Sequence, residues 1–246
     1  MSSSARAPDL KGRVVLVTGA GRGLGRALIH RLHARGALVA GCSRSGSDLD
    51  SLTLELNGVR EPPLLMTADV TDTRSVERWV AAARERWGRI DGLINNASIL
   101  GEREPLRDVD VEAWRGVIDV NLTGAFIVCR AVLPAMRDAG AGSIVNVSSG
   151  VGNRPREAWG AYAVSKWALE AFSWNLALEE RSAGIRVNVV DPGAMRTEMR
   201  HAAYPSEDPA ALPAPIDVTD VFLWLMDPAS AWRSGERFVA RDWRAP

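Results

Sequence analysis

The stretch RVVLVTGAGRGLGRALIHRLHARG, residues 13–36, joins three local signals. Residues 13–19 are an almost uninterrupted apolar run, which is typical of a strand buried on both faces of a parallel sheet. Residues 22–36 carry Leu24, Leu28 and Leu32 at helical spacing, and a glycine follows as a helix stop. A glycine-rich turn links the two segments. The stretch therefore predicts a strand, a tight loop and a helix at the start of an open α/β sheet.

The same alternation continues to the end of the chain. Further strands are expected at 37–43, 63–70, 90–98, 142–149, 185–193 and 236–240, and further helices at 48–57, 72–88, 110–138, 159–183 and 217–226. The helical stretch 110–138 falters near Asp119–Asn121, because Asp and Asn compete for backbone hydrogen bonds. Residues 194–216 are predicted to be irregular. These segments predict one α/β domain, a Rossmann-like doubly wound parallel sheet of about seven strands with helices on both faces.

Composition limits the possible partners. The 246 residues are 46% apolar and 24% charged, with 30 basic and 30 acidic side chains. A net charge near zero gives no reason to expect a nucleic acid or an anionic membrane as partner. Cys42 and Cys129 lie in apolar runs and are expected to be free thiols, and no residues have metal-ligand spacing. With no signal-like segment and no apolar run near 18 residues, the sequence predicts a cytoplasmic protein.

The glycine loop predicts a dinucleotide site. Gly19, Gly23 and Gly25 depart from the standard G-x-G-x-x-G spacing. They nevertheless provide a tight turn and a helix amino terminus that favours a pyrophosphate. A glycine-rich turn alone is weak evidence, since it can simply cap a helix. Its place after the first strand of an α/β unit favours the dinucleotide interpretation.

Residues at the end of the second strand indicate whether the cofactor is NAD(H) or NADP(H). An acid that holds the ribose 2′-hydroxyl of NAD is usual about twenty residues after such a loop. Here Arg44 stands at that place, preceded by Ser43, and Arg22 projects from the loop itself. Two guanidiniums and a hydroxyl suit a 2′-phosphate, so NADP(H) is favoured over NAD(H). Solvated surface arginines are the alternative, and Asp48 is near enough to keep NAD(H) open.

Tyr162 and Lys166 lie four residues apart in the predicted helix 159–183, so they share one face. An ammonium beside a phenol makes the phenol proton easier to lose. The pair is therefore a candidate acid/base, and a surface pair is the alternative. Residues NNAS (95–98), DVNLTGAF (119–126), NVSSGVGNRPREAWGAYAVSK (146–166) and DPGAMRT (191–197) accompany it.

Together with TGAGRGLG (18–25), these motifs resemble the classical short-chain dehydrogenase/reductase family over nearly the whole chain. The resemblance implies hydride transfer between a nicotinamide cofactor and a carbonyl or secondary alcohol. It implies Tyr162 as general acid/base, Lys166 as its electrostatic partner and as a ligand of the nicotinamide ribose, and Asn121 as holder of a relay water. Ser149, thirteen residues before Tyr162, is favoured over Ser148 for polarising the substrate oxygen; Ser148 is expected to satisfy backbone at the strand end.

The resemblance also implies the cofactor contacts and the assembly. The cofactor-binding residues are expected to be Gly19, Arg22, Gly23, Leu24, Gly25, Ser43, Arg44, Asp69, Val70, Asn95, Ala97, Tyr162, Lys166, Pro192, Gly193 and Thr197. Residues 1–12 are expected to be a short frayed tail, residues 13–246 the single domain and residues 194–215 a lid over a small-molecule carbonyl or alcohol. A homodimer or homotetramer is implied. A non-catalytic NADP(H)-binding redox sensor remains the alternative function.

Overall fold

A computed structural model describes residues 8–246 and contains one sheet of seven parallel strands in the order β3-β2-β1-β4-β5-β6-β7. The prediction of a doubly wound parallel sheet is therefore confirmed. The strand order reverses between β1 and β4, which is where α/β sheets of this type open a crevice at the carboxyl ends of their strands. The strands are β1 (Val14–Thr18), β2 (Leu38–Ser43), β3 (Leu64–Thr67), β4 (Gly92–Asn95), β5 (Gly142–Val147), β6 (Ile185–Asp191) and β7 (Arg237–Val239).

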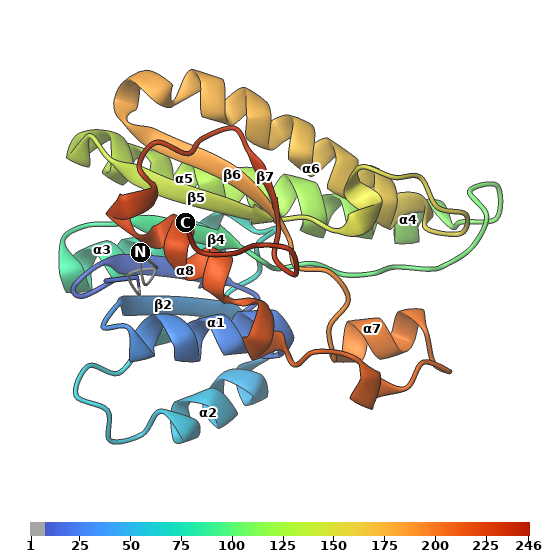
Figure 1. Ribbon diagram of the computed structural model, residues 1–246, viewed down its shortest axis with the longest axis horizontal. Helices are drawn as coiled ribbons and strands as arrows, with labels where there is room; N and C mark the ends of the chain where they lie inside the picture. Colours follow the sequence, from blue (N-terminus) through green and yellow to red (C-terminus); the bar gives the residue numbers. More distant parts are fainter. Residues whose placement is uncertain (1–7) are drawn as a thin grey trace, which may run out of the picture.

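Helices cover both faces of the sheet (Figure 1). Side chains of α1 (Gly23–Ala34), α2 (Gly46–Glu55) and α8 (Asp220–Met226) belong to one apolar cluster. Those of α3 (Thr73–Trp87), α5 (Gly124–Ala139) and α6 (Gly160–Glu179) belong to a second cluster. Along β1, Val15 and Val17 join the first cluster while Val14 and Leu16 join the second. This double burial explains why the strand sequences are continuously apolar.

The helix after β4 carries the irregularity that its sequence predicted. It consists of α4 (Val111–Ile118), a π-helical turn η1 (Asp119–Thr123) and α5. The combined stretch Val111–Ala139 is, by length and composition alone, apolar enough to cross a membrane, since an 18-residue window within it has a mean hydropathy of 1.6. Its contacts with α3, β4 and β5 account for that apolar character, since it forms part of a layer that covers the sheet.

Two segments are more ordered than the sequence predicted. The segment 194–216 was predicted to be irregular, but it contains α7 (Glu198–Ala203), whose amino terminus is capped when Thr197 Oγ1 accepts a hydrogen bond from the Arg200 amide. The frayed-tail prediction is wrong from residue 8 onward, because Leu10 is fully buried in the core and the Gly12 amide donates to the Gly36 carbonyl. Residues 1–7 of the predicted tail lie outside the described residues.

Candidate active site

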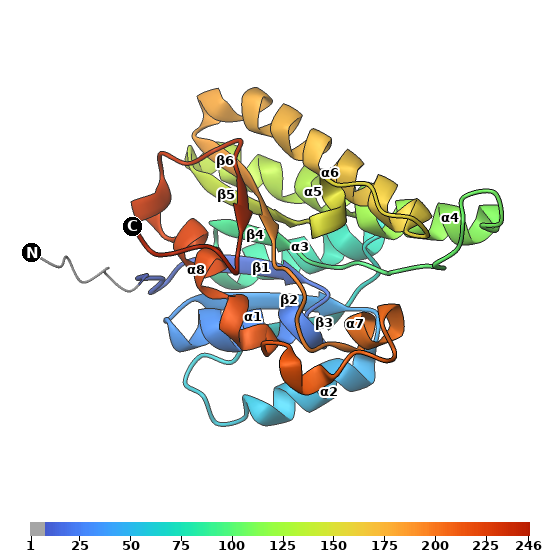
Figure 2. The same ribbon diagram turned by 45° about the vertical axis from the view of Figure 1, so that its right-hand side comes forward.

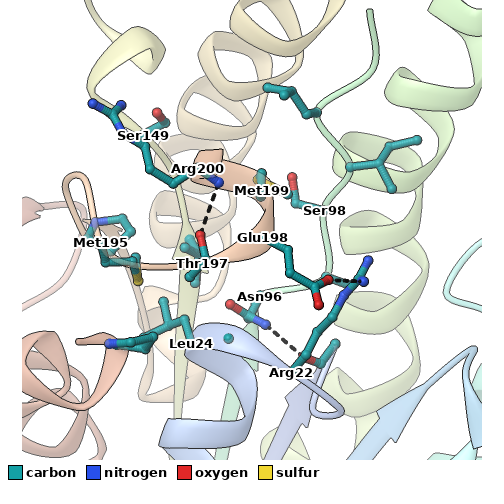
Figure 3. Close-up of a pocket in the computed structure, with 18 of the residues that line it drawn as sticks. Arg22, Leu24, Asn96, Ser98, Ser149, Met195, Thr197, Glu198, Met199 and Arg200 are labelled. Atoms are coloured by element: carbon teal, nitrogen blue, oxygen red, sulfur yellow. Dashed lines mark hydrogen bonds and ion pairs between the residues drawn. The ribbon is translucent and has the colours of Figure 1, made fainter. Parts of the chain in front are cut away.

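A cavity of about 1600 Å³ opens at the carboxyl edge of the sheet. The glycine loop, the ends of β2, β4, β5 and β6, and the segment around α7 line it. In Figure 2, α7 stands apart from the sheet beside this edge. Figure 3 shows side chains from the glycine loop, the strand ends and α7 facing one another across the cavity. Most, though not all, of the residues predicted for the site line this cavity.

The glycine loop approaches the β4 turn closely. Gly19 has a φ of +65°, and a Cβ there would lie 2.9 Å from Ala97 Cα. A Cβ on Gly25 would collide with the Gly19 carbonyl oxygen, so Gly25 allows α1 to pack on the loop. Gly25 does not line the cavity, although it was predicted to bind cofactor. Its role is to hold the loop in shape.

The loop fits a dinucleotide. Arg22 is the N-cap of α1, and no side chain caps that helix end. The first amides of a helix lack intrahelical acceptors, and the helix dipole favours an anion at that place. Here these amides adjoin Gly19, Gly21 and Gly23, which line the cavity. A nicotinamide dinucleotide could place its pyrophosphate there, beside Thr197 and Gly193, which also line the cavity.

Arg44, Ser43 and Asp48 line the cavity at the end of β2 and the start of α2. Arg44 is exposed and pairs with no carboxylate among residues 8–246. The guanidinium of Arg22, in contrast, lies 2.6 Å from Glu198, and this ion pair links the glycine loop to α7 (Figure 3). Arg44 is thus the arginine that remains free for a 2′-phosphate.

Tyr162 and Lys166 line the same cavity from successive turns of α6, and Ser149 lines it from the residues after β5. Both α6 side chains are buried, Tyr162 to 8% and Lys166 to 2% exposure. The Lys166 ammonium donates to the Val147 carbonyl at 2.9 Å and lies 5.5 Å from the centre of the Tyr162 ring. The strand end therefore holds the lysine beside the phenol.

Burial controls the charge of both side chains. It raises the pKa of Tyr162 to about 12; the Ser149 hydroxyl opposes this shift, and the charge of Asp191 adds to it. Burial lowers the pKa of Lys166 to about 8, and Glu170 opposes that shift. The expected lowering of the tyrosine pKa by Lys166 is therefore absent in the protein alone. The free energy needed to remove a phenolate from water exceeds the stabilisation that the nearby ammonium provides.

Besides Gly25, three predicted site residues do not line the cavity. Asn121 lies in the π-helical turn, where its side chain bonds both backbone groups of Ile99 and the Ser165 hydroxyl. Asn95 was placed at the ribose, but it is buried and donates to Asn146 Oδ1 at 2.9 Å. Asp69 was placed at the adenine, but its carboxylate accepts hydrogen bonds from Thr71.

The neighbouring Asn96 lines the cavity instead of Asn95 and donates to the carbonyls of Thr18 and Gly19. The one-residue difference follows from the strand, in which successive side chains point to opposite faces. The remaining predicted residues all line the cavity: Gly19, Arg22, Gly23, Leu24, Ser43, Arg44, Val70, Ala97, Ser149, Tyr162, Lys166, Pro192, Gly193 and Thr197.

A buried ionic network that the sequence did not predict lies next to Ser149. Glu170 accepts hydrogen bonds from the Ser148 hydroxyl at 2.5 Å and from Arg237 Nε at 3.1 Å. Arg237 also donates to Asp191 at 3.0 Å and to the Ser149 carbonyl at 3.2 Å. Ser148 was expected to satisfy backbone, but its hydroxyl bonds a carboxylate. The network fixes the backbone of Ser149 and the start of the turn after β6.

Comparison with known proteins settles the family. A family model described as short chain dehydrogenase matches residues 13–208. The chain belongs to the short-chain dehydrogenase family. The Escherichia coli protein YciK, an uncharacterised oxidoreductase, is 35% identical over 96% of this chain and 95% of its own length. Levodione reductase from Leifsonia aquatica is 39% identical over 80% of this chain and 74% of its own.

A solved structure from Shigella flexneri, described as a short-chain dehydrogenase complexed with NADP, superimposes with a TM-score of 0.91. It is 33% identical and covers 96% of this chain and all of its own. The chain is accordingly an enzyme, an NAD(P)-dependent short-chain dehydrogenase/reductase. The family resemblance, the Rossmann-like fold and the prediction of a nicotinamide-dependent oxidoreductase are confirmed.

Proposed function

We propose that the protein transfers hydride between NADP(H) and a carbonyl or secondary alcohol, with Tyr162 as general acid/base. One observation supports this above all: Ser149, Tyr162 and Lys166 line the same cavity as the uncapped amino terminus of α1. When bound there, the nicotinamide would supply hydride to a carbonyl carbon or take it from an alcohol carbon. The name of levodione reductase also favours a ketone as the group that is reduced.

The side chains supply the proton chemistry. In carbonyl reduction, the Tyr162 hydroxyl gives its proton to the substrate oxygen as negative charge develops there, and the Ser149 hydroxyl donates a hydrogen bond to the same oxygen. A pKa of about 12 keeps Tyr162 protonated at neutral pH, so it starts as a donor. The Lys166 ammonium then stabilises the phenolate that remains. In alcohol oxidation the phenolate takes the proton back.

The test is NADPH oxidation against a panel of ketones, measured for the wild type and for Tyr162→Phe. The variant should lose activity by roughly 10²–10⁴-fold, the usual contribution of a positioned acid/base. NADPH affinity should change little, because Phe keeps the ring that packs beside Trp159. If the wild type binds NADPH tightly but reduces no ketone, the result favours the redox-sensor alternative over the proposed reaction.

NADP(H) is proposed over NAD(H) because Arg44 pairs with no carboxylate in the described part of the chain, and the NADP complex of the Shigella flexneri relative supports this. Arg44→Asp should weaken NADP⁺ binding about tenfold or more, through loss of one charge-assisted contact, and should leave NAD⁺ binding equal or improved. Calorimetric titration of both dinucleotides checks this. Equal affinities for the two in the wild type would contradict the preference.

We also propose that the enzyme acts on a small molecule in the cytoplasm as a homodimer or homotetramer, without a nucleic acid or membrane partner. The balanced charge of 30 basic and 30 acidic residues supports the absence of a polyanionic partner. Exposed aromatic side chains on α5 and α6, including Phe126, Trp167 and Trp174, support an assembly of identical chains.

A further inference from the structure

Positive charge gathers at the end of the cavity that is remote from the glycine loop. Arg154 and Arg156, between β5 and α6, line the cavity there. Arg103, from the loop between β4 and α4, does not line the cavity, but it donates a hydrogen bond to the carbonyl of Ala203, which does. None of these three guanidiniums has a carboxylate partner within residues 8–246.

Two of these guanidiniums converge on Tyr204, which follows α7. Arg103 lies 4.9 Å from the centre of the Tyr204 ring, and Arg156 donates a hydrogen bond to the Tyr204 hydroxyl. Arg200 also stacks on this ring at 4.0 Å, but Glu207 neutralises it at 2.6 Å. Like charges that gather without counterions repel one another, and that free energy is recovered when an anion binds between them.

An aromatic wall connects this charge to the reacting phenol. The Trp159 ring lies 5.6 Å from the Tyr162 ring and 6.1 Å from the Tyr204 ring. Arg103 also stacks on Trp159, at 4.9 Å. Arg103 therefore contacts the ring that adjoins Tyr162, and Arg156 contacts Tyr204, the ring on the other side of Trp159. Trp159 is buried, and its indole N–H is without a hydrogen-bond partner in the described part of the chain.

We propose that the substrate is a carbonyl compound that bears a carboxylate or a phosphate at the end remote from its carbonyl. Arg154 and Arg156, which line the cavity, bind the anionic group, Arg103 adds positive charge from its place on the Trp159 ring, and the body of the substrate lies along Trp159. The carbonyl then reaches Tyr162. This assignment rests on the proposed carbonyl chemistry at Tyr162 and adds to it the class of compound that the cavity selects.

The test compares matched ketones with and without the charge. One pair is 4′-acetylbiphenyl-4-carboxylate and its methyl ester, a second is 4-acetylbenzoate and its methyl ester, and a third is 4-acetylphenyl phosphate and 4-acetylphenol. In the wild type, kcat/KM should be at least about tenfold higher for the anion than for its neutral partner, and the advantage should shrink as salt is added. Comparison of the carboxylate and phosphate pairs identifies which anion is preferred.

Arg156→Gln should reduce the advantage of each anion over its neutral partner about tenfold, through a higher KM for the anion. Arg74→Gln is the matched control, because Arg74 is an exposed arginine on α3 outside the cavity. If the arginines only fasten the lid, Arg156→Gln will slow anionic and neutral ketones equally, and the proposal is overturned. It is also overturned if no anion is preferred over its neutral partner in the wild type.

Calorimetry separates this proposal from the proposed reaction. Each biphenyl ketone is titrated into the wild type and Arg156→Gln in the presence of NADP⁺, with which no ketone can be reduced. Tighter binding of the carboxylate that depends on Arg156 supports the anion site even if no ketone is reduced with NADPH. Reduction of ketones without such a preference supports the reaction and refutes the anion site.

Discussion

At the scale of single residues, burial decides the starting charges of Tyr162 and Lys166, the proposed acid/base and its partner. Tyr162 begins as a neutral phenol because its pKa is about 12, and Lys166 begins as an ammonium that loses its proton near pH 8. The direction of each shift is that expected for a group whose charged form is removed from water. The protein without its cofactor is therefore set up to donate a proton, which suits carbonyl reduction at neutral pH.

These pKa shifts predict that activity decreases on the alkaline side of its pH profile. As pH rises through about 8, Lys166 becomes neutral and no longer stabilises the phenolate, whereas Tyr162 keeps its proton until near pH 12. The value of kcat/KM for NADPH reports on the enzyme before the cofactor binds, and it should fall above pH 8. Lys166→Arg, whose guanidinium stays charged, should move this fall to higher pH. An unchanged alkaline limb in that variant would assign the fall to another group.

At the scale of elements, the short strand β7 reaches into the site through Arg237. The side chain is only 17% exposed, and its partners Glu170 and Asp191 are 1% and 9% exposed. It donates hydrogen bonds to the Ser149 carbonyl and to the Asp191 carboxylate, and the Gly193 amide donates to the same carboxylate. The carboxyl-terminal strand thereby positions Ser149, the residue proposed to polarise the substrate.

Arg237→Met should leave two buried carboxylates without their cation and lower the free energy of unfolding by about 3 kcal/mol. It should also lower kcat for ketone reduction, since the Ser149 backbone loses a donor. Arg233→Met is the control from the preceding loop: its ion pair with Glu236 is more exposed and is worth at most about 1 kcal/mol. Urea denaturation and steady-state kinetics measure both variants. Equal losses of unfolding free energy and of kcat in the two variants would show that Arg237 does not position Ser149.

The elements also show why some features could be predicted and others could not. The strands, the glycine loop and the break near Asn121 carry local signals, namely apolar runs, glycines and backbone-competing side chains. Whether Asn95 or Asn96 faces the cavity depends on which face of the sheet each side chain points to. The apolar residues before them do not reveal this, because both faces of the sheet are buried. The Arg237–Glu170 contact joins positions 67 residues apart and has no local signature. The helix α7 was missed because its six residues are too few for a periodic pattern.

At the scale of the whole molecule, the layer of α5 and α6 has an outer face that is unusually apolar. Val164, Trp167, Trp174 and Leu178 recur along α6 at helical spacing and are 42%, 47%, 44% and 73% exposed. Phe126 of α5 continues the face and packs edge-on against Phe172 of α6 at 6.3 Å. Aromatic side chains gathered on one exposed face are typical of a surface that is covered by another protein.

A second copy of this chain is the expected occupant, because the proposed assembly is built from identical subunits whose faces can pair about a twofold axis. The double variant Trp174→Glu/Leu178→Glu would bury four carboxylates in such a symmetric interface, and it should convert the assembly to monomers. Leu54→Glu is the control, since Leu54 is 75% exposed on α2, in the layer on the other side of the sheet. Light scattering after size-exclusion chromatography measures the mass. A wild type that is monomeric at micromolar concentration, or a double variant that keeps the wild-type mass, would exclude this face as the interface.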